Sequence, residues 1–179
     1  MKRPSLFVLF VLPIASTLSA QALPKDVKRS VDSFTGDTVW ETKYGRLDES
    51  NGCKRTDLAV VWKLVRGPHN RAEWLTYEYI DIATPFHKSK WINAVSAAVS
   101  VDGRIIEAKE HPFSPHLDSE HAGDVRTERA AFLLPDSTLR LVAEAKVAKV
   151  RFLGTDRTCD GVVEDNMHVR LHSLLDATR

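Results

Sequence analysis

The sequence predicts a mainly β fold: an antiparallel β-sandwich, or a curved sheet, of about six or seven strands with one or two short helices. Segments that alternate apolar and polar residues dominate the chain, and turn-forming residues separate them at hairpin spacing. Only two stretches place apolar residues at helical spacing. Because hairpins outnumber helices, the pattern favours a sandwich or a sheet closed by a helix, with an α+β arrangement as the alternative.

Two strong strand signals follow each other and predict an antiparallel hairpin. Residues 58–65 are almost continuously apolar, and residues 74–82 are rich in aromatic and β-branched residues. The connection between them contains Gly67, Pro68 and Asn70, which are typical turn residues. We therefore expect these two strands to be neighbours.

A second hairpin is predicted around Asp102-Gly103. This dipeptide tolerates the positive φ angles that tight hairpin turns require, and apolar strand-forming residues precede and follow it. Further strands are expected at 125–134 and 147–153, and a weaker one at 38–47.

Two helices are expected in the last third of the chain. The first follows Pro135, and Asp136 or Ser137 could cap its free backbone donors. The second spans 164–176 and begins with acidic residues, which suit a helix N-terminus, while its leucines fall on one face.

The N-terminus has the three parts of a secretory signal peptide. Basic Lys2-Arg3 precedes an apolar run over 6–14, and Ala20-Gln21-Ala22 has the form of a cleavage site. The apolar run is shorter than the roughly 20 residues that a membrane-spanning helix needs. The sequence thus predicts a signal peptide at 1–22 and a single exported domain at 23–179, periplasmic or secreted and bacterial in type, without a stable membrane anchor after cleavage.

The charge balance disfavours a nucleic-acid partner. The chain has 25 Lys and Arg against 24 Asp and Glu, a net charge of +1, and removal of the signal peptide makes the balance slightly negative. Binding to a nucleic acid needs a basic excess or a clustered basic face. Neither is visible in the sequence.

The two cysteines, Cys53 and Cys159, are predicted to form a disulfide. Both lie in turn-like surroundings, and no C-x-x-C spacing suggests a zinc or redox site. Thiols of one exported domain are typically paired. The alternative is two separate buried thiols, and either interpretation removes both residues from catalysis.

A histidine-rich segment is the main metal candidate. His111, His116 and His121 occur with Asp118 and Glu120, and imidazole and carboxylate groups bind zinc, copper or nickel. The spacing matches no defined metal motif, and the prolines and polar residues also describe a solvated connection. We expect no cofactor, with a divalent transition metal as the alternative.

Catalytic motifs are missing from the sequence. His168 and His172 share one face of the second predicted helix, but the H-E-x-x-H pattern of a metalloprotease is absent, which favours surface histidines. No G-x-S-x-G string marks a hydrolase nucleophile. The catalytic residues of any enzyme activity are therefore unknown, and the pattern favours a non-catalytic domain.

Aromatic residues offer a candidate binding surface. Tyr77 and Tyr79 share one face of the predicted strand 74–82, opposite Trp74 and Ile80. Aromatic rings give large contact areas at low entropic cost, so an exposed face could bind sugars, peptides or a protein. Packing in the core is the alternative.

The sequence therefore predicts a small exported, non-catalytic binding or interaction domain, such as an inhibitor, an immunity-type protein or an envelope accessory protein. Its expected partner is a protein or an envelope component. Two alternatives stay open, an exported metal-binding protein that uses the segment 111–121 and a small hydrolase without a recognisable motif.

Overall fold

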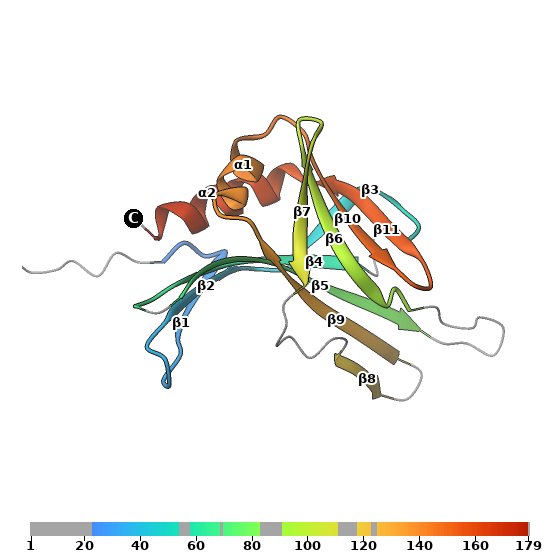
Figure 1. The fold of residues 1–179 in the computed structure, drawn as a ribbon, viewed down its shortest axis with the longest axis horizontal. Coiled ribbons are helices and arrows are strands. Elements are labelled where there is room, and N and C mark those ends of the chain that lie inside the picture. Colours follow the sequence, from blue (N-terminus) through green and yellow to red (C-terminus); the bar gives the residue numbers. More distant parts are fainter. Residues whose placement is uncertain are drawn as a thin grey trace, which may run out of the picture.

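The computed structural model describes residues 23–53, 58–68, 70–82, 91–110, 118–122 and 125–178 (Figure 1). The strands are β1 (Val27–Val31), β2 (Thr38–Thr42), β3 (Gly45–Asn51), β4 (Leu58–Arg66), β5 (Arg71–Ile82), β6 (Ala94–Val101), β7 (Arg104–Glu110), β8 (Asp118–Ala122), β9 (Val125–Leu134), β10 (Ala148–Gly154) and β11 (Thr158–Val163). The helices are α1 (Thr138–Glu144) and α2 (Asp165–Asp176). The fold is mainly β with two helices, as predicted, but the described residues form eleven strands instead of the expected six or seven.

Eight of the strands close into an antiparallel barrel. Around the ring the order is β3, β11, β10, β6, β7, β9, β5 and β4, and β4 pairs with β3 again. β2 and β1 continue the sheet beyond β4, while β8 pairs with β9. The expected sandwich is therefore wrong, because the curved sheet meets itself instead of forming two separate layers.

Closure of the ring depends on two short ladders. The residue pairs that join the two sides are Gly45↔Val60 and Arg46↔Ala59 between β3 and β4, and Lys109↔Leu133 and Glu110↔Phe132 between β7 and β9. In the ladder between β3 and β4, a side chain on Gly45 would collide with Met167 of α2, so the glycine permits the helix to approach the strand. Such brief contacts between distant segments leave no periodic pattern in the sequence.

Both predicted hairpins are confirmed. β4 and β5 pair from Leu58↔Tyr79 to Arg66↔Arg71. β6 and β7 meet at a turn in which Asp102 has φ 48° and Gly103 has φ 89°. The expected strand at 125–134 is β9, and the one at 147–153 is β10, shifted by one residue.

The weak strand signal at 38–47 corresponds to two strands. β2 pairs with the second half of β4, and β3 pairs with its first half before it continues along β11. At the end of β2, the buried Thr42 accepts a hydrogen bond through Oγ1 from the backbone N–H of Trp62, at 3.1 Å. The threonine hydroxyl thus accepts from the Trp62 N–H of β4 at the point where the strand paired with β4 changes from β2 to β3.

The N-terminus of α1 is not capped as expected. Ser137 occupies the N-cap position with φ 70°, and its side chain makes no capping hydrogen bond. Glu73 of β5, which is buried, accepts hydrogen bonds from the backbone N–H groups of Ser137 (2.9 Å) and Leu139 (2.8 Å) instead. A carboxylate on a facing strand thereby anchors the helix to the barrel.

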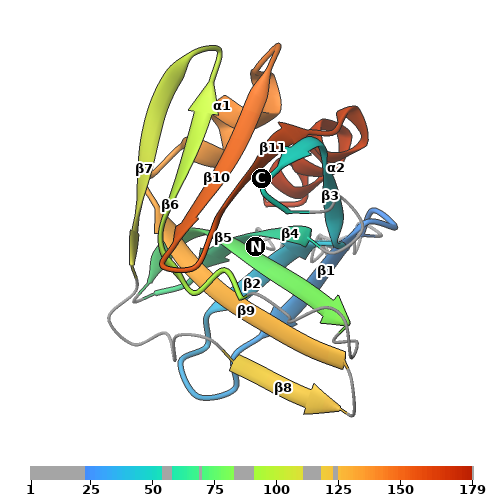
Figure 2. The ribbon, with the colours of Figure 1, turned by 90° about the vertical axis from the view of Figure 1, so that its right-hand side faces the viewer.

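The interior of the barrel is filled with side chains. Trp62, Tyr77, Phe132 and Phe152 are fully buried, and the Tyr77 and Phe152 rings lie 4.7 Å apart. The two helices pack on each other on one side of the barrel (Figure 2), and their buried residues belong to the same core. These helix residues are Leu139, Val142, Ala143, Met167, Leu171 and Leu174.

Candidate functional site

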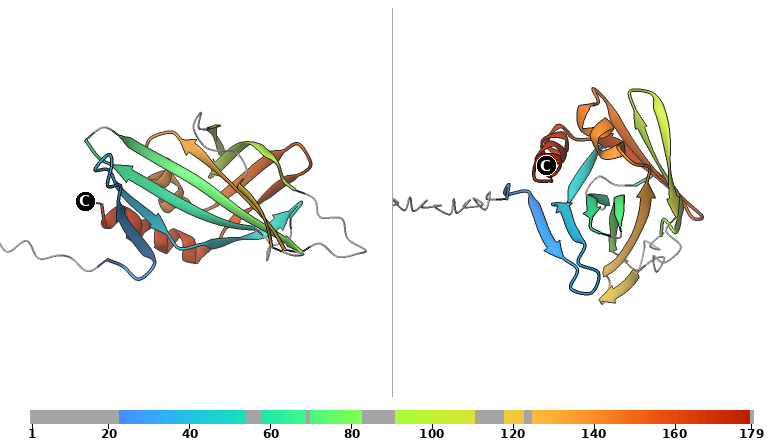
Figure 3. Two further views of the ribbon diagram at one scale, coloured as in Figure 1. Left: turned by 90° about the horizontal axis from the view of Figure 1, so that it is seen from below. Right: turned by 60° about the vertical axis from the view of Figure 1, so that its left-hand side comes forward.

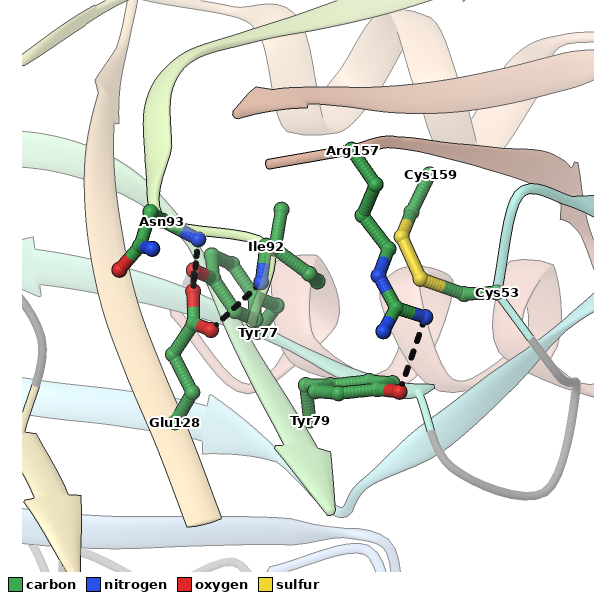
Figure 4. Close-up of a disulfide and its surroundings, with 8 residues drawn as sticks. All are labelled: Cys53, Tyr77, Tyr79, Ile92, Asn93, Glu128, Arg157 and Cys159. Atoms are coloured by element: carbon green, nitrogen blue, oxygen red, sulfur yellow. Dashed lines mark hydrogen bonds between the residues drawn. A yellow bond between two sulfur atoms is a disulfide. The ribbon is translucent and has the colours of Figure 1, made fainter. Parts of the chain in front are cut away.

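The predicted disulfide between Cys53 and Cys159 is present (Figure 4). Its Cα atoms are 5.2 Å apart, and both cysteines are buried. The bridge lies beside the Asn51↔Asp160 pair that joins β3 to β11, so it fixes one wall of the barrel. A disulfide of this kind indicates an oxidising environment, which supports export.

Tyr77 and Tyr79 do not form an exposed face. Their exposed fractions are 0% and 2%, because the inner face of β5 carries both rings and the closed barrel covers them. Of the two interpretations given to these residues, core packing agrees with their position. Their hydroxyl groups nevertheless belong to a polar cluster inside the barrel.

Glu128 is the centre of this buried cluster (Figure 4). Its side chain is fully buried on β9 and accepts hydrogen bonds from the Tyr77 hydroxyl and from the backbone N–H groups of Ile92 (2.7 Å) and Asn93 (2.9 Å). The residues that donate to it come from β5 and from the segment that enters β6. The carboxylate therefore holds this segment against the barrel wall.

A second part of the cluster involves the turn between β10 and β11. Arg157 donates a hydrogen bond through Nη1 to the Tyr79 hydroxyl at 3.1 Å, and its guanidinium carbon lies 5.2 Å from the centre of that ring. Asn93 donates through Nδ2 to Asp156 at 2.8 Å. These contacts tie the turn to β5 and to the start of β6, close to the disulfide.

The chemistry of the cluster is that of a structural anchor. Both oxygens of Glu128 already accept hydrogen bonds, which makes the carboxylate a poor general base. Burial of the phenol, together with its hydrogen bond to Glu128, raises the pKa of Tyr77 far above its usual value of 10.0, so this hydroxyl stays protonated. The cluster binds its own chain and presents no free nucleophile or base.

Sequence reasoning overlooked Glu128 and Glu73. The available signal was their position: Glu73 shares a strand face with the buried Leu75 and Tyr77, and Glu128 shares one with the buried Phe132 and Leu134. A charged residue at such a position must find partners inside the fold.

The candidate metal ligands fall mostly outside the described part of the chain. This holds for His111 and His116 and for the side chains of Asp118, Glu120 and His121. Within the described residues, no group of three or more His, Cys, Asp or Glu side chains could hold a metal ion. On α2, His168 is half-buried and His172 is exposed.

The outer face of the barrel carries a groove along β6. Its floor consists of the small side chains of Ser96, Ala98 and Ser100. Its walls come from β7 and β10, the two strands that flank β6 in Figure 2. The wall residues are Ile105 and Glu107 on β7, and Lys149, Arg151 and Leu153 on β10. Two adjoining hollows of about 370 Å³ and 290 Å³ make up this β6 groove.

Each wall of the β6 groove carries both an exposed aliphatic side chain and charged side chains. Ile105 is 69% exposed and Leu153 is 47% exposed, which is high for large aliphatic side chains. Arg151 is held by Asp160, which accepts hydrogen bonds from Nε at 3.1 Å and Nη2 at 2.7 Å. Because adjacent strands lie about 4.8 Å apart, the backbones of the two wall strands are about 10 Å apart.

None of the helices among the described residues is long and apolar enough to cross a membrane. No protein-family model, curated protein or solved structure matches this chain. Its function must therefore be argued from the fold and from the surfaces described above.

Proposed function

We propose that this protein is an exported, non-catalytic binding domain that holds a segment of a partner protein in the β6 groove. The observation that carries the proposal is the exposure of Ile105 and Leu153 on either side of a floor of small side chains. Large aliphatic residues that flank a hollow are typical of a surface that another protein covers.

The filled interior supports binding on the outside. Barrels that carry small ligands leave space between their inner faces, whereas here Trp62, Phe132 and Phe152 occupy the centre. Glu128 engages the Tyr77 hydroxyl and the backbone N–H groups of Ile92 and Asn93 inside the barrel. We therefore expect a partner to bind on the outer surface of the barrel.

The mixed character of the groove supports a protein as the partner. Lys149 and Glu107 place opposite charges on the two walls, next to the aliphatic side chains. Protein interfaces combine an apolar centre with a polar rim in this way, whereas nucleic acids need a surplus of positive charge. The net charge of +1 for the whole chain offers no such surplus.

Export is part of the proposal. The signal-peptide pattern at 1–22 and the disulfide both agree with a periplasmic or secreted location. The same oxidising environment would suit an inhibitor, an immunity-type protein or an envelope accessory protein.

Affinity capture from envelope extracts and culture fluid tests the proposal. The disulfide-bonded wild-type domain is compared with Ala98→Arg, which fills the groove floor, and with Val169→Arg at an exposed position of α2. We expect a stoichiometric protein partner that is lost with Ala98→Arg and kept with Val169→Arg. Bound zinc or copper without a protein, or equal capture by both variants, would contradict the proposal.

A further inference from the structure

Among the described residues, no strand pairs with the outer edge of β1. β1 stands at the end of the strand order with β2 as its neighbour, and Figure 3 shows it at the rim of the molecule. The Asp26 carbonyl accepts from the Lys43 N–H at 3.0 Å, and the Asp32 N–H donates to the Asp37 carbonyl at 2.8 Å. Because antiparallel ladders alternate, the even-numbered residues of β1 face β2, and the peptide groups of Arg29 and Val31 face outward.

The side chains along this edge are exposed, and two of them, Lys28 and Arg29, are basic. Lys28, Arg29, Ser30 and Val31 are all exposed. Glu41 on β2 lies 3.7 Å from Lys28 and 3.4 Å from Lys63, so one carboxylate is shared between two ammonium groups. A positive charge therefore remains beside the free peptide groups.

An apolar tip continues this edge. Phe34, in the turn between β1 and β2, is 97% exposed, and Val31 beside the turn is 56% exposed. The turn is well defined, because the Asp32 carboxylate accepts hydrogen bonds from the backbone N–H groups of Phe34 (2.8 Å) and Thr35 (3.0 Å). Full exposure of a phenyl ring on an ordered turn suits a contact residue.

We propose that the β1 edge receives an extended acidic segment of another protein as an added strand, with an apolar side chain of that segment against Val31 and Phe34. The outward peptide groups of Arg29 and Val31 would hydrogen-bond with the added backbone. Lys28 and Arg29 point to opposite faces of β1, so two consecutive acidic side chains of the added segment would face them. This surface is separate from the β6 groove, so it does not depend on the function proposed above.

Charge and hydrogen bonding favour an acidic protein segment over a second copy of this chain and over a lipid surface. A second copy paired antiparallel through the same edge, in the register centred on Arg29, would bring Arg29 opposite Arg29, and like charges facing each other are destabilising. A lipid surface could take up Phe34, but hydrocarbon offers no donors or acceptors to the peptide groups of the edge.

Two peptides of about ten residues serve as probes, one that repeats Glu-Glu-Ser-Val and the other with Lys in place of each Glu. Amide exchange is followed by NMR on the folded, disulfide-bonded protein. We expect the acidic peptide to slow exchange of the Arg29 and Val31 amides, and the basic peptide to leave both unchanged.

Two variants make the test specific. The double substitution Lys28→Glu and Arg29→Glu should reverse the preference between the peptides, with at least tenfold weaker binding of the acidic one. Val31→Pro removes an outward N–H while it leaves the ladder to β2 intact, so it should abolish binding of the acidic peptide and keep the unfolding midpoint.

Several results would overturn the inference. They are an absence of protection at Arg29 and Val31 with millimolar acidic peptide, protection confined to other strands, or no response to the charge reversal. Dimerisation that Val31→Pro abolishes would assign the edge to a second copy. Binding to phosphatidylglycerol vesicles that Phe34→Ser abolishes, without any response to the peptides, would assign the tip to a membrane surface. Failure of the β6-groove experiment would leave these measurements unaffected.

Discussion

Glu128 shows how one buried carboxylate organises several parts of the chain. It receives donors from β5 and from the segment before β6, and two of the donating residues, Tyr77 and Ile92, are fully buried. A donor that loses its acceptor inside a protein costs about 1–3 kcal/mol. The stability of the barrel should therefore be sensitive to this one side chain.

Replacement of Glu128 by alanine is expected to lower the free energy of unfolding by about 3–5 kcal/mol, because it leaves several buried donors unsatisfied. Tyr77→Phe removes only one of these donors and keeps the carboxylate bonded to Ile92 and Asn93, so it should cost about 1–2 kcal/mol. Urea unfolding measures both. A loss below about 1 kcal/mol for Glu128→Ala would show that the network contributes little.

Tyr77 should also influence stability at high pH. Burial and the bond to Glu128 raise its pKa above the usual 10.0, so the folded protein keeps a proton that the unfolded chain releases above pH 10. The free energy of unfolding should fall above pH 10, by up to about 1.4 kcal/mol per pH unit from this group. In Tyr77→Phe that fall should be smaller, and equal slopes for the two proteins would contradict the assignment.

At the scale of elements, α1 depends on a residue of the sheet. Glu73→Ala removes the acceptor of two backbone N–H groups at the helix start and should cost about 2 kcal/mol. Asp136→Ala is the matched control, because Asp136 is exposed and should cost less than about 0.5 kcal/mol. Thermal unfolding distinguishes the two variants. A larger loss of stability with Asp136→Ala than with Glu73→Ala would mean that Asp136, and not Glu73, caps the helix.

The elements also show what the sequence could predict. The hairpins β4–β5 and β6–β7 have local signals, alternation and turn residues, and both were expected. β1 and β11 were not expected, because polar and charged residues dilute their alternation. The sequence predicted a cap from Asp136 or Ser137, which lie next to α1 in the chain. The cap from Glu73 depends on the packing of β5 against α1, which the sequence does not show.

At the scale of the whole molecule, closure decides which side chains are accessible. The rings of Tyr77 and Tyr79 are buried because ladders of two residue pairs join the sides of the barrel. The sequence left the inner and outer faces of β5 undecided, since Glu78 lies on the face opposite Tyr77 and Tyr79 together with Trp74 and Ile80. The β6 groove, by contrast, arises from small residues on one strand between large residues on two others, which the sequence order does not reveal.

The disulfide should contribute strongly to the stability of the closed barrel. It joins residues 106 positions apart, and the loop-entropy model gives about 4–5 kcal/mol for a loop of this size. The double variant Cys53→Ala and Cys159→Ala should therefore unfold at much lower urea concentration than the wild type. A loss below about 1 kcal/mol would mean that the remaining contacts between β3 and β11 hold this wall without the covalent bond.

The central claim is that this protein recognises its partner on the outside of the barrel, along β6. Site-specific photo-crosslinking in the producing cells tests it most directly, with a photoreactive residue at Ala98 in the groove or at Val169 on α2. The account predicts a discrete adduct with one protein from position 98, none from position 169, and loss of the adduct when Ile105→Asp is added beside the probe. No adduct from position 98, or the same adduct from both positions, would contradict it.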